Sequence, residues 1–262
     1  MILQHGLFQS AGIFVTNEYD SMAFRLADGG ADVWLGNNRA VYLSHAERSP
    51  EEAEYWQWGL DELGRFDVPA MVEYVCRASG HRQVVWAGHS QGNAQLVLAL
   101  AYWPALAARV RLFIALAPAV HVGELTQPVL RALVHMPDWL HDALFGRKQF
   151  LPVMSFMQRR LPPALFANSA YAMFRFLFNW ADTLWVRRRK VRYFQFSPRP
   201  VSARLLRDWA RCIRAGHLCA RDRTVRVQPE QQLRCPVAVF YGTSDSLVAG
   251  DRLIEQLRRA RD

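Results

Sequence analysis

The chain has 262 residues, of which 51% are hydrophobic, so its length and composition suit one large domain with a substantial core. Its formal net charge of +9 favours anionic surfaces, but no recognised nucleic-acid module accompanies the charge, so we expect no nucleic-acid partner. The four cysteines form neither a CxxC pair nor a zinc spacing, which excludes a disulfide-rich scaffold and leaves free thiols as the expectation.

Short apolar runs alternate with helical patterns along most of the chain, which is typical of an α/β fold with a mostly parallel sheet and helices on both faces. The chain opens on a predicted strand-to-loop junction, with no signal-peptide pattern and no apolar run long enough to span a membrane. Further strands are predicted at residues 31–35, 83–87, 110–116 and 237–241, and helices at 61–75, 91–102 and 252–259.

The region from about residue 121 to 229 interrupts this alternation. It is rich in Pro, Met, Phe and Trp, and residues 151–180 carry apolar side chains at helical spacing. We predict an inserted helical cap at 121–229 between two parts of the core, 1–120 and 230–262, the second of them incomplete. The cap packs on the core and can also cover an apolar pocket. Its basic run, Arg187–Lys190, is either a solvated face or a contact with an anionic membrane.

Gly88–Gly92 reads Gly-His-Ser-Gln-Gly, a G-x-S-x-G motif placed between a predicted strand and a predicted helix. This context is typical of a nucleophile elbow, a tight turn that needs small residues two positions before and after its serine. Such a turn presents the serine hydroxyl above the sheet and beside a helix N-terminus, which favours developing negative charge. We therefore predict Ser90 as a nucleophile.

Acyl transfer needs two N–H donors for the oxygen of its tetrahedral intermediate. One donor comes from the residue after the nucleophile, here Gln91, and the other from an early strand–helix loop. The segment His5-Gly6-Leu7 resembles such a loop, so Leu7 is the predicted second donor.

Asp245 ends a late predicted strand and is the predicted acid of a serine triad, whose order in this kind of fold is Ser, Asp or Glu, then His. Asp251 competes for that role but is better explained as a carboxylate at a helix start. His89, inside the elbow, is expected to be structural, and His45 to be a loop residue. No histidine follows Asp245, because the last one in the sequence is His217.

Five blocks resemble the acid lipase family of α/β-hydrolases, which includes gastric and lysosomal acid lipases and fungal steryl ester hydrolases. The blocks occur in order at residues 5–10, 32–37, 66–70, 88–92 and 113–118. Residues 118–120 and 241–245 look closer to the fungal steryl ester hydrolases. The chain departs from the family pattern at Ala40, where Gly is usual, in lacking a histidine after the acid, and in lacking the family's N-terminal segment, so it looks truncated at both ends.

This resemblance implies an α/β-hydrolase fold and a serine esterase or lipase that hydrolyses steryl esters or triacylglycerols without a metal or an organic cofactor. It implies Ser90 as nucleophile, Asp245 as triad acid, and Leu7 and Gln91 as backbone donors. It also implies an intracellular membrane or lipid-droplet surface. A catalytically inactive lipid-binding protein of the same fold and an acyltransferase remain the alternatives.

Overall fold

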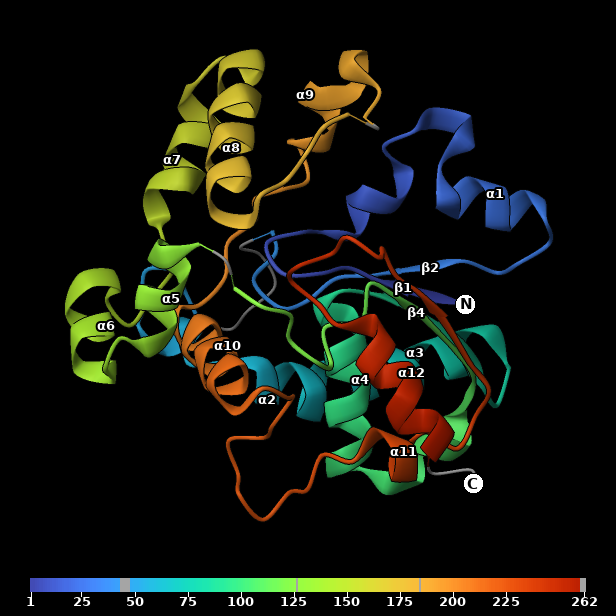
Figure 1. The fold of residues 1–262 in the computed structure, drawn as a ribbon. Coiled ribbons are helices and arrows are strands. Elements are labelled where there is room, and N and C mark those ends of the chain that lie inside the picture. The colour runs from blue at the N-terminus through green and yellow to red at the C-terminus, as the bar shows by residue number, and fades with distance from the viewer. Residues whose placement is uncertain (43–47, 126, 184, 260–262) are drawn as a thin grey trace.

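The computed structural model describes residues 1–42, 48–125, 127–183 and 185–259 and contains a five-stranded parallel sheet in the order β2-β1-β3-β4-β5 (Figure 1). The strands are β1 (Ile2–Gln4), β2 (Trp34–Gly36), β3 (Val84–His89), β4 (Val110–Leu116) and β5 (Val237–Phe240). This architecture confirms the predicted α/β fold. His45 lies outside the described residues.

Helices cover both faces of the sheet because alternate residues of each strand point to opposite sides. Ile2, Trp86 and Phe113 pack with α3 (Val68–Ser79) and α4 (Gln91–Tyr102) on one face. On the other face, their neighbours Leu3, Ala87 and Ile114 pack with α1 (Met22–Asp28). The short helices α2 (Leu60–Glu62) and α11 (Pro229–Gln232) and the final helix α12 (Gly250–Arg259) lie on the side of α4 (Figure 1).

A group of helices lies between β4 and β5 in the chain and beyond one end of the sheet in space (Figure 1). Its members are α5 (Pro128–His135), α6 (Asp138–Phe145), α7 (Pro152–Arg160), α8 (Pro163–Phe178), α9 (Lys190–Tyr193) and α10 (Ala203–Ala215). Helix α10 contacts α5 and α6 as well as α2, so it connects this group to the core. The domain division at residues 120 and 229 stays a prediction.

Several element boundaries differ from the sequence prediction, and proline explains two of them. The predicted helix 61–75 is divided by a π-helical turn, Leu63–Asp67, because Pro69 has no N–H to donate to the carbonyl of Arg65. The indole Nε1 of Trp103 donates to that carbonyl instead, at 2.8 Å. Likewise, the helical pattern at 151–180 is split into α7 and α8 before Pro163.

Backbone pairing explains a third difference, and backbone conformation explains the departure from the family pattern at Ala40. The strand predicted at 31–35 begins three residues later, at Trp34, where its pairing with β1 starts. Ala40 has a φ of +63°, a left-handed conformation that glycine adopts without strain, which accounts for the glycine usual at this position. No helix among the described residues combines the length and apolarity that crossing a bilayer requires.

Candidate active site

Ser90 lies at the sharp turn between β3 and α4, as the motif predicts. Its φ of +50° and ψ of −113° are unusual for a residue other than glycine. The strained turn is held by hydrogen bonds to β4: the Ser90 N–H donates to the Leu116 carbonyl at 2.9 Å. The Asn93 amide donates to the carbonyls of both Ser90 and Leu116, at 3.1 and 3.0 Å. A backbone strained and held in this way is typical of functional sites.

The glycines of the motif are required by close approaches to backbone. A Cβ on Gly88 would lie 2.8 Å from the Asn93 nitrogen, inside the following helix. A Cβ on Gly92 would lie 2.6 Å from the Gln4 carbonyl oxygen, at the end of β1. Any larger residue at either position would therefore push the elbow away from the neighbouring backbone.

The predicted donor loop packs directly against this elbow. Gly6 donates its N–H to the Gln9 side chain at 2.9 Å, closing a tight turn in which Phe8 has a φ of +60°. A Cβ on Gly6 would lie 3.1 Å from the Cβ of Ser90. Leu7 and Gln91 both line the cavity that Ser90 lines, and Gln91 is the first residue of α4, whose N–H has no partner within the helix.

Two histidines beside the elbow are buried and hydrogen-bonded. His5 accepts from the Asn38 N–H at Nε2 (3.2 Å) and contacts its neighbour's carbonyl through Nδ1 (2.8 Å). His89 contacts the Gln9 side-chain oxygen through Nδ1 at 2.9 Å. Burial lowers the pKa of each imidazole to about 4. These contacts agree with a structural role for His89.

Asp245 follows β5 in an exposed loop at the same end of the sheet as Ser90. Its Oδ1 accepts the N–H groups of Leu247 and Val248, at 2.8 and 3.3 Å. Val248 in turn lines the cavity with Ser90. Within the described part of the chain, no imidazole donates to Asp245, so its role as a triad acid stays a prediction. Asp251 lies in the first turn of α12, as expected for a helix-start carboxylate.

An apolar cavity of about 200 Å³ lies between the elbow and the helices that follow β4. Ser90, Leu7 and Gln91 line it on the core side. On the opposite side, α5, α6, α8 and α10 contribute Leu130, Leu133, Val134, His141, Phe145, Phe178, Leu206, Trp209, Ala210 and Ile213. The serine thus faces a mostly apolar lining, which suits hydrocarbon rather than a charged ligand.

Trp209 is a site residue that the sequence did not reveal. Its indole Nε1 donates to the side-chain oxygen of Gln91 at 2.7 Å, and both side chains are buried. The bond links α10 to the first residue of α4, beside Ser90. The two partners are separated by 118 residues, so no local spacing in the sequence could indicate the contact.

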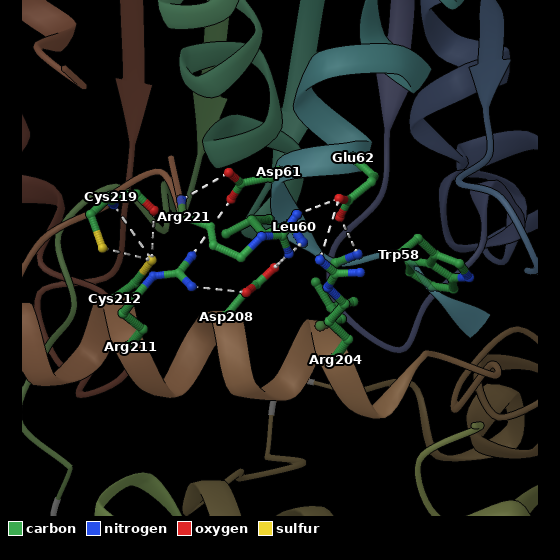
Figure 2. Close-up of polar contacts among 12 residues, drawn as sticks. Trp58, Leu60, Asp61, Glu62, Arg204, Asp208, Arg211, Cys212, Cys219 and Arg221 are labelled. Carbon is green, nitrogen blue, oxygen red and sulfur yellow. Dashed lines mark hydrogen bonds and ion pairs between the residues drawn. The ribbon is translucent and has the colours of Figure 1, made fainter. Parts of the chain in front are cut away.

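Helix α10 is held against α2 by charged side chains gathered around the buried Asp208, and this cluster also escaped the sequence prediction (Figure 2). Asp208 accepts the Leu60 N–H at 2.9 Å and pairs with Arg211 at 3.1 Å and Arg221 at 3.4 Å. Arg221 also pairs with Glu62. Figure 2 shows these side chains converging from α10, α2 and the segment after α10. We call Asp208, Arg211, Arg221 and Glu62 the α10 clamp.

Known proteins resemble this chain in sequence and in fold. A family model described as alpha/beta hydrolase fold matches residues 1–260. The chain belongs to this family. It is 31% identical to sterol esterase 2 of Saccharomyces cerevisiae, over 91% of this chain and 46% of that protein. It is 34% identical to human lipase member K, over 97% of this chain and 68% of that protein.

These relatives confirm the resemblance to the acid lipases, and the chain spans less than half the length of sterol esterase 2. Among solved structures, a soluble variant of the monoglyceride lipase of Saccharomyces cerevisiae matches with a TM-score of 0.53. That match covers 99% of this chain and 72% of the lipase at 16% identity, so it shows a shared α/β-hydrolase fold.

Proposed function

We propose that this chain carries the serine machinery of a carboxylic ester hydrolase that acts on neutral-lipid esters, either steryl esters or triacylglycerols. The observation that carries the proposal is the shared cavity: a serine on a strained elbow opens onto an apolar space lined by both predicted donor residues. The names of sterol esterase 2 and lipase member K support this class of substrate.

In the proposed reaction, Ser90 attacks the ester carbonyl while a histidine oriented by Asp245 takes its proton. The backbone N–H groups of Leu7 and Gln91 hold the oxyanion, and a donor of this kind contributes about 2.7–4 kcal/mol. The alcohol leaves, an acyl-enzyme remains on Ser90, and water releases the fatty acid. No metal or organic cofactor takes part.

The cavity size suggests how the ester would lie. At about 200 Å³, it is smaller than the roughly 300–1,000 Å³ of typical ligand pockets. We therefore place the acyl chain inside, between the elbow and the proposed cap at 121–229, and the alcohol part towards the entrance. The enzyme would then discriminate between esters by their acyl group more than by the shape of their alcohol.

Labelling with a fluorophosphonate probe tests the nucleophile directly, because such probes react with activated serines. We would compare this chain, a form continued to the next in-frame stop codon, and the Ser90→Ala variant of each. Ser202→Ala is unsuitable as a control because the Ser202 hydroxyl caps α10, so Ser79→Ala, in the last residue of α3, serves instead.

Labelling that requires Ser90 but not Ser79 supports the proposal. If the 262-residue chain itself reacts, one of its own histidines acts as the base; if only the longer form reacts, the base follows Asp262. Absence of labelling in every folded form would overturn the esterase proposal and favour a lipid-binding protein of the same fold.

A further inference from the structure

Two of the four cysteines form a close pair at the end of α10. The Sγ atoms of Cys212 and Cys219 lie 3.7 Å apart, and the Cys219 N–H donates to the Cys212 sulfur at 3.5 Å (Figure 2). Cys212 is fully buried in the helix, whereas Cys219 is partly exposed on the segment that follows it. The Cys219 thiol is thus reachable from solvent, and the Cys212 thiol lies buried next to it.

The surroundings make Cys219 the thiol that ionises first. The hydrogen bond from Cys212 and the positive charge of Arg211 lower the pKa of Cys219 below the usual value of a cysteine thiol. By contrast, burial raises the pKa of Cys235, and the hydrogen bond with Cys219 raises that of Cys212. Reactive cysteines are typically partly exposed and electropositive in this way, whereas buried ones are inert.

The backbone holds the pair in place. Helix α10 ends at Gly216, whose φ of +75° turns the chain back on itself. The Leu218 N–H then donates to the Val120 carbonyl at 2.9 Å, which fixes the returning segment beside the helix end. The sulfur atoms need to approach from 3.7 Å to about 2.05 Å to form a disulfide.

We propose that Cys212 and Cys219 form a modification site for low-molecular-weight disulfides, whose product is an intramolecular disulfide joining the end of α10 to the returning segment. The Cys219 thiolate attacks one sulfur of the small disulfide and releases one thiolate. Cys212 then gives its proton to solvent and attacks the Cys219 sulfur, and the second small thiolate leaves. Two protein thiols are oxidised and one small disulfide is reduced to two thiols.

The new bond would act on the helix that supports the site. Cys212 follows Arg211 of the α10 clamp, and Trp209, one turn earlier, bonds Gln91 at the elbow. Closing a short loop at the C-terminal end of α10 restricts the unfolded chain, so we expect the oxidised form to unfold at a midpoint about 5 °C higher. This inference is independent of the proposed esterase activity.

Oxidised glutathione is the probe for this site. We expect the folded protein to lose two of its four titratable thiols and to retain no glutathione. Trypsin cleaves after Arg211, Arg214 and Arg221, so the product should give the peptide 212–214 disulfide-linked to the peptide 215–221. In the Cys212→Ala variant, Cys219 should keep glutathione as a stable mixed disulfide, because the resolving thiol is gone.

The double variant Cys76→Ser/Cys235→Ser is the matched control and leaves only the pair. It should lose both remaining thiols at the wild-type rate, and it keeps the test valid if Cys212→Ala does not fold. Preferential reaction of Cys76 or Cys235 in the folded protein, glutathione retained on wild-type Cys219, or no loss of thiols would each overturn the proposal.

Discussion

His5 and His89 make the nucleophile turn sensitive to acid. Burial lowers the pKa of each to about 4, below the value of about 6.5 expected in the unfolded chain. The folded state therefore disfavours the protonated imidazoles, so their stabilising effect is complete above about pH 6.5 and is lost as the pH falls towards 4. For His5, the expected loss in the free energy of unfolding is about 2 kcal/mol between about pH 7 and pH 5.

Urea unfolding at the two pH values measures this loss. His5→Gln keeps an acceptor near the Asn38 N–H but has no charge to gain. It should reduce the pH dependence of the free energy of unfolding by roughly half and leave the part that is due to His89. His81→Gln changes an exposed histidine and should behave like the wild type. A full wild-type pH dependence in His5→Gln would show that this imidazole is not the acid-sensitive group.

At the scale of elements, the α10 clamp fastens to α2 the helix that carries Trp209. Asp208 is 2% exposed, and Asp208→Ala would leave the Leu60 N–H without its acceptor and deprive Arg211 and Arg221 of a partner. Leaving a buried N–H without its acceptor costs about 1–3 kcal/mol. We expect a fall of that size in the free energy of unfolding measured with urea.

Two variants distinguish the stabilising effect of the α10 clamp from the general effect of losing a carboxylate. Asp208→Asn retains an oxygen for the Leu60 N–H and should cost less than Asp208→Ala. Asp20→Ala removes a carboxylate from the exposed pair with Arg25 and should change stability by under about 1 kcal/mol. Equal effects of Asp208→Ala and Asp20→Ala would mean that the clamp does not hold α10.

Local patterns predicted most of the elements and the turn that carries Ser90, because each is specified within a few residues. The sequence gives 91–102 as a helix and 110–116 as a strand, and both have these bounds in the structure. Ser90 was recognisable because its glycines are required by backbone lying against the same turn. The contacts that support the site, from Asp208 to Leu60 and from Trp209 to Gln91, join residues more than 100 positions apart. Propensity and periodicity carry no information about such pairs, so only the folded chain reveals them.

At the scale of the whole molecule, the helices beyond the sheet expose large apolar side chains, one of them beside an arginine. Trp139, Leu144, Phe156, Leu165 and Phe176 on α6, α7 and α8 are each more than half exposed. The Arg160 guanidinium lies over the Phe156 ring, 5.7 Å from its centroid. Apolar groups with neighbouring cations favour an anionic lipid surface, so we propose that these helices contact an anionic phospholipid membrane.

Sedimentation with vesicles of anionic and of zwitterionic phospholipid tests this contact. The chain, with its net charge of +9, should bind anionic vesicles more tightly, and added salt should weaken the binding. Phe156→Ser and Phe176→Ser should each weaken it about fivefold, corresponding to about 1 kcal/mol of lost apolar burial. Phe24→Ser, on α1 away from α7 and α8 (Figure 1), should have no effect. If Phe24→Ser weakens binding as much as the other two, the contact is general charge attraction, and the apolar side chains of α7 and α8 do not enter the lipid.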